Sequence, residues 1–382
     1  MTAAELAILL NVDVQQAIEQ NITRDPLAIA LDKAVAHPRE VSTQVKYLQR
    51  ARLKLPRLYE ARAIIPQRAF EQSSREESAE AKRLSGKRLL DLTCGLGVDA
   101  AALSKRFECV VALERDEVLA EVVRENMRRQ GITNVEVVTS SAEEYVARAE
   151  EQFDWVYVDP DRRTAAEERV VRLEDCSPNV VAMWDAIGRI APRVAIKCSP
   201  LFDVEEAFRL FGRCGVEAIS VGGECKEVMI YADGREPALA AEAVGRGRVE
   251  VLRRDLSAAT KPERFAAEEY GWLIVPDVAL QKARLVRHTL GAVADVWSEN
   301  SFAFARLKPE GVLGRAEQIE RIEPFDVKAL KRELKGVGVD ILVRDFPMGV
   351  DEVRRRTGAR CGSKRRLALT RVEGKSYTIF LK

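Results

Sequence analysis

The sequence predicts an α/β fold in which helices surround a mostly parallel sheet. Short apolar runs alternate with helical patterns between residues 85 and 236, as in chains that build parallel sheets. A turn with two glycines, TCGLG, directly follows the first of these runs. The last two runs, Val216 to Val221 and Glu227 to Tyr231, are separated by a connection so short that it joins antiparallel neighbours.

A helical region, residues 1–84, precedes the predicted sheet. Its apolar residues recur at helical spacing, and Asp25-Pro26 marks the start of one helix. Such an amphipathic stretch is typical of a packing cap. Arg62, Arg68 and Arg75 are candidates for a basic rim around a site on the sheet.

The first strand and the turn after it predict a cofactor site. Lys87 to Leu92 is typical of a strand buried on both faces, and the glycines of the turn let backbone approach a ligand closely. Glu114 ends the second strand, where an acid accepts hydrogen bonds from both hydroxyls of a ribose. The predicted cofactor-binding residues here are Thr93, Cys94, Gly95, Gly97, Glu114 and Arg115.

Asp91 separates two cofactor classes that share this geometry. An anion at the end of the first strand repels a pyrophosphate seated on the next helix, whereas the ammonium of a methionine moiety pairs with it. Asp91 therefore favours S-adenosyl-L-methionine (SAM) over a nicotinamide dinucleotide.

Two further strands deliver polar residues to the same edge of the sheet. Phe153 to Val158 leads into Asp159-Pro160-Asp161-Arg162-Arg163, and Arg193 to Lys197 leads into Cys198-Ser199-Pro200. Open α/β sheets bind their ligands at the carboxyl ends of the strands. We therefore expect these segments to line one site.

Residues 85–235 resemble a class I SAM-dependent methyltransferase, with DLTCGLG as motif I, Glu114 as the ribose acid and DPDRR as motif IV. The resemblance implies a Rossmann-like, seven-stranded sheet that ends in an antiparallel hairpin. FEQSSREESAEAKR (residues 70–83), IKCSP and GGECKE extend the resemblance to a bacterial group with a small ferredoxin-like domain and a C-terminal THUMP-like domain. That group implies an RNA-modifying enzyme whose partner is structured RNA, either tRNA or rRNA.

The resemblance also assigns the two ends of the cofactor. Many relatives place an acid for adenine after the third strand, but here Val135 to Thr139 leads into Ser140-Ser141-Ala142-Glu143. The adenine contact is therefore left to Ser141, beside Ala142, to Glu143 or to backbone. Glu71, Gln72 and Ser73 are expected to close over the methionine end.

Asp159 is the predicted catalytic residue, with Pro160 stiffening its loop. At the strand end its carboxylate can accept a hydrogen bond, or a proton, from an acceptor amine. The residues predicted to hold the nucleotide or its phosphate are Asp161, Arg162, Arg163 and Lys197. We therefore expect transfer of the methyl group to a base nitrogen by direct in-line displacement.

Three alternatives to this function remain open at the level of sequence. Methylation of pyrimidine carbon 5 requires a thiolate, and Cys198 is the candidate, although only Lys197 stands near it to activate it. A scaffold with this fold that binds RNA without turnover is the second alternative. A nicotinamide-dependent oxidoreductase is the third, and Asp91 and the terminal hairpin argue against it.

Composition bounds the organisation of the chain. A length of 382 residues and an apolar fraction of 47% indicate two or three domains. We expect a helical region at 1–84, a methyltransferase domain at 85–236, a linker and small ferredoxin-like domain at 237–310, and a THUMP-like domain at 311–382. With no apolar span, no secretory signal and no C-x-x-C pair, we expect a cytoplasmic protein without disulfides, metal or membrane contact.

The region after residue 236 is predicted to be α+β. Its candidate strands are Tyr270 to Pro276, Phe304 to Leu307, Gln318 to Glu323, Asp340 to Val343, Arg366 to Val372 and Tyr377 to Leu381, and its candidate helices are Val278 to Leu290, Val327 to Leu334 and Met348 to Arg356.

A basic cluster ends the chain although the net charge is only +1. Residues 351–382 contain ten Lys or Arg against three acids. Such a cluster suits the phosphates of RNA. The predicted RNA-binding residues are Arg354, Arg355, Arg356, Lys364 and Arg365.

Overall fold

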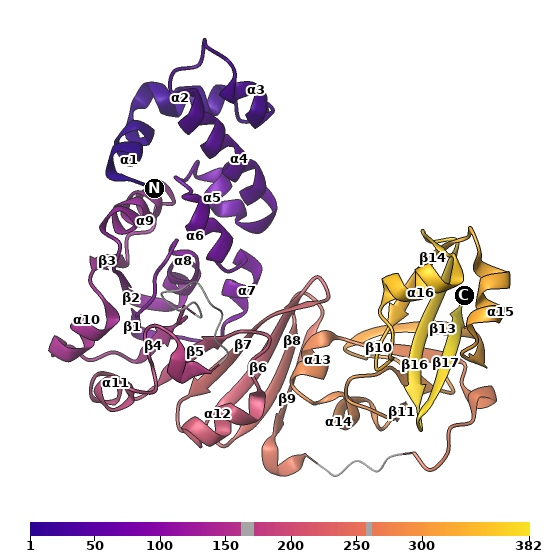
Figure 1. The fold of residues 1–382 in the computed structure, drawn as a ribbon. Coiled ribbons are helices and arrows are strands. Elements are labelled where there is room, and N and C mark those ends of the chain that lie inside the picture. Colours follow the sequence, from indigo (N-terminus) through magenta and orange to yellow (C-terminus); the bar gives the residue numbers. More distant parts are fainter. Residues whose placement is uncertain (162–171, 257–261) are drawn as a thin grey trace. The chain divides into compact units, whose positions relative to one another are not determined.

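A computed structural model describes residues 1–161, 172–256 and 262–382 (Figure 1). The chain forms two compact units. The first unit comprises residues 1–215 and 226–235, and the second comprises residues 216–225 and 236–382. The division into four regions that we expect from sequence stays a prediction.

The first unit begins with helices, as predicted. Asp25 caps one of them, because its side chain accepts the Leu27 N–H, and proline occupies the first position of that helix. Apolar residues of these helices form one core with Leu96, Val98 and Val122, so the helical region packs on α8 (Val98–Leu103) and α9 (Glu117–Arg129). The helices are α1 (Ala3–Leu10), α2 (Val12–Gln20), α3 (Pro26–Ala30), α4 (Pro38–Lys54), α5 (Pro56–Glu60), α6 (Gln67–Gln72) and α7 (Glu76–Ala81).

The sheet of the first unit has the order β3-β2-β1-β4-β5-β7. Neighbours are parallel except β7, which runs antiparallel to β5. The predicted parallel sheet and its antiparallel last strand are therefore confirmed. The strands are β1 (Gly86–Asp91), β2 (Phe107–Glu114), β3 (Val135–Thr139), β4 (Trp155–Val158), β5 (Val194–Cys198) and β7 (Glu224–Ala232).

Helices follow the parallel strands in chain order. Asp116 caps α9 by accepting the Leu119 N–H, and the apolar face of α9 is buried through Val122, Val123 and Met127. These helices are α8 (Val98–Leu103), α9 (Glu117–Arg129), α10 (Ala142–Arg148), α11 (Trp184–Ile190) and α12 (Val204–Phe211).

The second unit has more strands than the sequence predicts. The antiparallel pair β8 (Ala238–Ala243) and β9 (Gly247–Leu252) lies where we expect a linker, so the predicted count of seven strands is not confirmed. The helix expected from Val278 to Leu290 is instead two short helices, α13 (Val278–Lys282) and α14 (Val286–Leu290). They are separated by Arg284, which has a left-handed φ of 57°.

A separate sheet occupies the rest of the second unit, with the order β11-β12-β10-β13-β17-β16-β14-β15. Apolar residues of α15 and α16 form one core with the sheet, and an aromatic-rich core forms a second cluster. The elements are β10 (Trp272–Pro276), β11 (Asp295–Val296), β12 (Ala303–Ala305), β13 (Gly314–Pro324), α15 (Val327–Leu334), β14 (Gly338–Val343), α16 (Val350–Thr357), β15 (Arg360–Cys361), β16 (Arg365–Val372) and β17 (Lys375–Leu381). The strand β6 (Gly215–Val221) is not part of this sheet and lies beside β8 in the other one.

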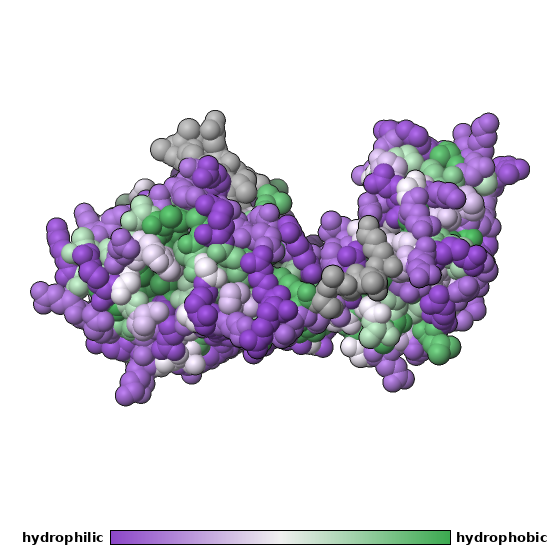
Figure 2. All heavy atoms as spheres, turned by 90° about the horizontal axis from the view of Figure 1, so that it is seen from below, coloured by the Kyte–Doolittle hydropathy of each residue, from purple (hydrophilic) through white to green (hydrophobic). Residues whose placement is uncertain are grey.

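Hydrophilic residues predominate on the face of each unit that Figure 2 shows, with apolar residues in patches between them. None of the helices in the described ranges is long and apolar enough to span a membrane.

Candidate functional site

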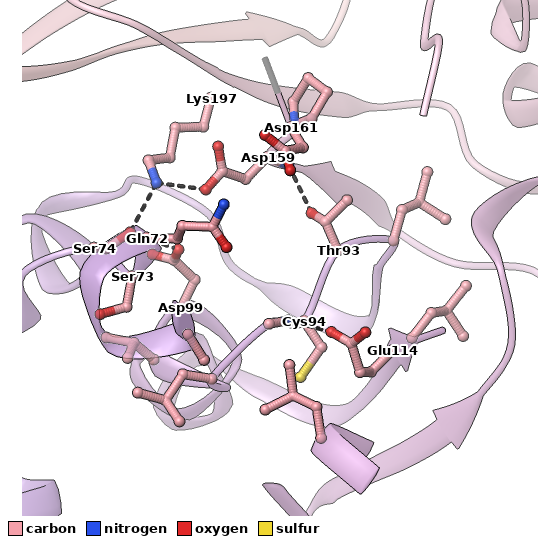
Figure 3. Close-up of a pocket in the computed structure, with 18 of the residues that line it drawn as sticks. Gln72, Ser73, Ser74, Thr93, Cys94, Asp99, Glu114, Asp159, Asp161 and Lys197 are labelled. Carbon is pink, nitrogen blue, oxygen red and sulfur yellow. Dashed lines mark hydrogen bonds and ion pairs between the residues drawn. The ribbon is translucent and has the colours of Figure 1, made fainter. Parts of the chain in front are cut away.

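The carboxyl ends of the parallel strands border one cavity of about 840 Å³ (Figure 3). All of its lining residues belong to the first unit. A volume at the upper end of the range for small-molecule sites leaves room for a cofactor beside part of a second ligand. Lining residues lie at or just after the ends of β1, β2, β3, β4 and β5, and Lys226 and Glu227 line the cavity from β7.

Hydrogen bonds fix the turn after β1 to its neighbours. The Thr93 N–H donates to Asp91 Oδ1 at 2.9 Å, and Thr93 Oγ1 accepts the Asp159 N–H at 2.7 Å. The Cys94 N–H donates to the carbonyl oxygen of Leu113 at 2.8 Å. The turn is therefore attached to both β2 and β4, which gives its cavity-facing atoms fixed positions.

Asp91 does not line this cavity, contrary to our expectation that it pairs with a ligand ammonium. Its side chain is fully buried, and one carboxylate oxygen has no hydrogen-bond partner in the described chain. Burial raises the pKa of Asp91 to about 8, so the carboxyl is mostly protonated at neutral pH. Asp91 thus orders the turn through Thr93, and it does not present a negative charge to the cavity.

The two glycines of the turn have different roles. Gly95 lines the cavity and has a left-handed φ of 55°. Gly97 does not line it, and a Cβ there would lie 2.8 Å from Met127 Cε and 2.9 Å from Val123 Cγ1. The need for glycine at position 97 therefore comes from packing, because α9 leaves no space for a side chain there, and a cofactor contact of Gly97 stays a prediction.

Glu114 faces the cavity from the end of β2. Its Oε2 accepts the Gly95 N–H at 3.1 Å, and its Oε1 accepts the Asp116 N–H at 2.9 Å. Each carboxylate oxygen has two lone-pair positions, so both retain one for a ligand hydroxyl. Burial raises the pKa of Glu114, although the two N–H donors oppose this shift. Such a carboxylate suits the hydroxyl pair of a ribose.

The end of β3 is built around Ser141. Its hydroxyl oxygen caps α10 by accepting the Glu144 N–H at 3.2 Å. Ser141, Ala142 and Glu143 all line the cavity. Because capping occupies the Ser141 oxygen, Glu143 has the more available acceptor atoms for an adenine amine.

Asp159 and Lys197 form an ion pair at the ends of β4 and β5. Lys197 Nζ lies 2.5 Å from Asp159 Oδ2 and donates to Ser74 Oγ at 2.9 Å (Figure 3). Burial opposes the positive charge of Lys197, but nearby carboxylates, Asp159 first among them, raise its pKa. Lys197, which we expect to hold the nucleotide, is therefore paired with Asp159, the predicted catalytic residue.

A buried ionic network behind this pair was not predicted. Ser74 Oγ donates to Asp99 Oδ2 at 2.8 Å, and Lys82 Nζ lies 2.6 Å from Asp99 Oδ1 and 2.9 Å from Glu227 Oε1. Lys82 has no exposed surface. The signal in the sequence is an acid inside the apolar helix VDAAAL, since a buried charge needs a partner.

The remaining predicted residues fall into three groups. Gln72, Ser73, Arg115, Pro160 and Asp161 line the cavity, as does Cys198. Arg162 and Arg163 lie outside the described residues. Arg354, Arg355, Arg356, Lys364 and Arg365 belong to the second unit.

Acids neutralise much of the C-terminal basic cluster. Arg354 lies 3.8 Å from Asp351, Arg356 lies 2.5 Å from Glu352, and Arg365 lies 3.3 Å from Glu320. Within the described ranges, Arg355 and Lys364 form no ion pair and are exposed. These two side chains retain the most available charge among the predicted RNA ligands.

Two family models match parts of the chain. The model described as THUMP domain-like matches residues 314–382, and the model described as Conserved hypothetical protein 95 matches residues 68–175. A crystal structure of a protein from Porphyromonas gingivalis W83, assigned as a methyltransferase, has a TM-score of 0.81 at 23% identity and covers 97% of each chain. The two chains therefore share a fold along nearly their whole length.

Comparison with curated proteins indicates the activity. Ribosomal RNA small subunit methyltransferase J of Coxiella burnetii is 31% identical over 127 residues, which cover 28% of this chain and 49% of the relative. An uncharacterised S-adenosylmethionine-dependent methyltransferase of Mycobacterium tuberculosis is 28% identical over 301 residues, which cover 76% of this chain and 79% of the relative. The chain is a SAM-dependent methyltransferase. The residues that match the THUMP domain-like model begin at Gly314, the first residue of β13.

The cavity of the methyltransferase has the chemistry that its cofactor requires. Glu114 offers acceptor positions for a ribose, and Gly95 exposes backbone beside it. Gln72 and Ser73 border the cavity from α6 and the residue after it. These features come from segments far apart in sequence, so only folding assembles them.

Proposed function

We propose that this methyltransferase transfers the methyl group of SAM to a base nitrogen in structured RNA, either tRNA or rRNA. The observation that carries the proposal is the Asp159 carboxylate, which lines the same cavity as Glu114 and is held by Lys197 at 2.5 Å. The rRNA methyltransferase relative and the THUMP-like domain support RNA as the acceptor.

The cofactor would bind along the carboxyl ends of β1, β2 and β3. Glu114 would accept hydrogen bonds from the ribose hydroxyls, Glu143 or nearby backbone would contact adenine, and Gln72 and Ser73 would border the methionine end. Bound SAM supplies an electrophilic methyl carbon on a sulfonium. The protein gains rate chiefly by holding the acceptor nitrogen in line with that carbon in a pocket that excludes water.

Asp159 would position the acceptor amine by accepting its hydrogen bond. Beside its ion pair with Lys197, the Asp159 carboxylate keeps lone-pair positions with which it would act as an acceptor and a weak base. A weak proton acceptor is sufficient, because the amine of the nucleobase becomes strongly acidic once it carries the added methyl group. The proton would then leave to Asp159 or to solvent.

The acceptor assignment is tested by nucleoside mass spectrometry of RNA from cells with and without this protein. We expect one N-methylated nucleoside to be absent from the cells that lack it. Asp159→Asn should lower kcat by 10²- to 10⁴-fold and leave the SAM dissociation constant within about twofold. Asp185→Asn, a change at an exposed position on α11 outside the cavity, serves as the control.

Two results would contradict the proposal. RNA with identical modifications in both cell lines would remove RNA as the acceptor. Loss of SAM binding in Asp159→Asn with normal turnover at saturating SAM would make Asp159 a cofactor ligand.

Carbon-5 methylation of a pyrimidine is the second candidate, because Cys198 lines the cavity beside Lys197. This chemistry requires the Cys198 thiolate to add to carbon 6 of the base. Cys198→Ala would abolish turnover under this mechanism and preserve it under nitrogen methylation. The position of the methyl group in the isolated nucleoside separates the two candidates independently.

A further inference from the structure

Basic residues of the N-terminal helical region border the cavity. Lys54, the last residue of α4, and Arg75, which precedes α7, both line it. Arg50 lies one helical turn before Lys54 and therefore shares its face of α4. We call Arg50, Lys54 and Arg75 the α4 cluster. All three belong to the same unit as Asp159.

Aromatic rings hold two of these cations in place. The Arg50 guanidinium lies 5.2 Å from the ring centre of Tyr47 and 5.0 Å from that of Phe70. Lys54 Nζ lies 4.7 Å from the Phe70 ring centre and donates to the Phe70 carbonyl oxygen. Tyr47 and Phe70 are buried and contact each other edge to face. The cluster is thus a preorganised group of positive charges.

The acids nearby do not neutralise Lys54. Glu71 lies 3.7 Å from Arg50, and Glu77 lies 3.4 Å from Arg75. In the described chain, no carboxylate lies within ion-pair distance of Lys54 Nζ. Burial, followed by the charges of Lys197, Arg50 and Arg75, lowers the pKa of Lys54 to about 8, and Glu71 opposes this shift. A partly buried cation whose pKa is lowered by other cations favours an anionic ligand.

The surroundings favour a polymer that enters from solvent. The side chains of Arg50 and Arg75 are 48% and 34% exposed, and Arg75 lines the cavity. Arg75 donates to the Leu53 carbonyl oxygen at 3.1 Å, and the Leu53 side chain is 81% exposed. Exposed cations beside an exposed apolar group fit a nucleotide chain, which carries phosphates and apolar base faces together.

We propose that the α4 cluster binds a phosphate of the acceptor RNA next to the nucleotide in the cavity, with Lys54 as the central ligand. This inference rests on the proposed function, because it takes RNA as the acceptor. It places an RNA contact on the catalytic unit itself, on residues that lie outside the C-terminal basic cluster.

The test measures RNA and SAM affinities separately. The RNA probes are a fluorescein-labelled oligouridylate and a labelled RNA hairpin, since a phosphate contact does not depend on sequence. The variants are Lys54→Gln, which keeps a hydrogen-bond donor, and Lys54→Arg, which keeps the charge. Arg52→Gln is the matched control, because Arg52 is exposed on the same helix and does not line the cavity. Calorimetry gives the SAM dissociation constant of each variant.

We expect Lys54→Gln to raise the RNA dissociation constant roughly tenfold and to reduce the slope of log Kd against log salt by about 1. Lys54→Arg and Arg52→Gln should remain within about threefold of the unchanged protein. SAM affinity should not change in any variant. Thermal unfolding of Lys54→Gln and Lys54→Arg checks that both variants are folded.

Three results would overturn the inference. A loss of SAM affinity in Lys54→Gln with unchanged RNA affinity would identify the anion as the cofactor carboxylate. Unchanged RNA and SAM affinities in this variant, with RNA still methylated, would overturn the phosphate contact alone. Failure of the unchanged protein to bind either RNA would overturn both this inference and the proposed acceptor.

Discussion

Two buried aspartates at the site have opposite protonation states. Among the described residues no cation contributes to the pKa of Asp91, which burial raises to about 8. Asp99 is also buried, but Lys82 and Lys197 outweigh that burial and lower its pKa to about 2. Near neutral pH the first is mostly neutral and the second is ionised, so position relative to the lysines decides which acid carries charge.

The neutral Asp91 predicts a pH-dependent stability. The unfolded chain releases this proton near pH 4, whereas the folded protein retains it to about pH 8. Stability therefore falls as pH rises between these values, because the folded state binds more protons. In the unchanged protein, this group should lower the free energy of unfolding by about 2 kcal/mol between pH 6 and pH 8, and Asp91→Asn should not show that decrease. Urea denaturation at both pH values measures it, and equal pH dependence in the two proteins would disprove the assignment.

Glu114 predicts a loss of cofactor affinity on truncation. Glu114→Ala leaves the ribose hydroxyls without acceptors and should cost about 1–3 kcal/mol of SAM binding free energy. Glu117→Ala, at an exposed position in the first turn of α9, should leave binding unchanged. Calorimetry with SAM compares the two variants. Equal affinities would exclude Glu114 from the cofactor site.

At the scale of residues, sequence spacing predicts some of the side chains that line the cavity and misses others. Glu114 and Asp159 could be predicted because each ends a strand whose neighbours are apparent in the sequence. Asp99, Lys82 and Lys54 could not, because their partners are distant along the chain. Asp91 was misplaced because sequence does not reveal which face of the strand end reaches the cavity.

Among the elements, the turn between β1 and α8 has the strictest requirements. Gly97 combines a φ of 79° with crowding by Val123 and Met127. Gly97→Ala should therefore destabilise the protein by about 2–4 kcal/mol, through backbone strain and overpacking together. Gly131→Ala is matched for strain, because its φ is 68° and no atom would meet its Cβ. We expect Gly131→Ala to lower the free energy of unfolding by about 1 kcal/mol, as measured by denaturant unfolding. Equal losses of stability in the two variants would show that crowding contributes nothing.

The strands that could be predicted share a property that β8 lacks. Strands β1 to β5 are apolar runs beside helical patterns, and this alternation predicts parallel strands. The sequence of β8, ALAAEA, consists of residues that favour helices. Its extended form depends on pairing with β9 across the turn that contains Gly245. Tertiary pairing overrides local preference here, so the sequence alone indicates a linker.

On the scale of the whole molecule, a nearly neutral chain carries separate basic surfaces. In the second unit, Arg355 and Lys364 lack acidic partners among the described residues, whereas Arg356 pairs with Glu352. Neutralising Arg355 and Lys364 together should reduce the salt slope of RNA binding by 1–2, because two phosphate contacts are lost. Arg356→Gln should change it less. Fluorescence anisotropy across a salt series measures both, and equal slopes in all proteins would leave the cluster without an RNA contact.

The path of the chain between the units limits how this enzyme can be divided. Residues 216–225 belong to the second unit, yet residues 226–235 return to the first and bring Glu227 to Lys82. A truncation after residue 215 would remove β7 and with it Glu227. The buried Lys82 would then keep one carboxylate partner, Asp99, instead of two. A junction between residues 215 and 216 would therefore leave the catalytic unit incomplete. A single junction that keeps the unit whole lies after residue 235, and it carries residues 216–225 along with the enzyme.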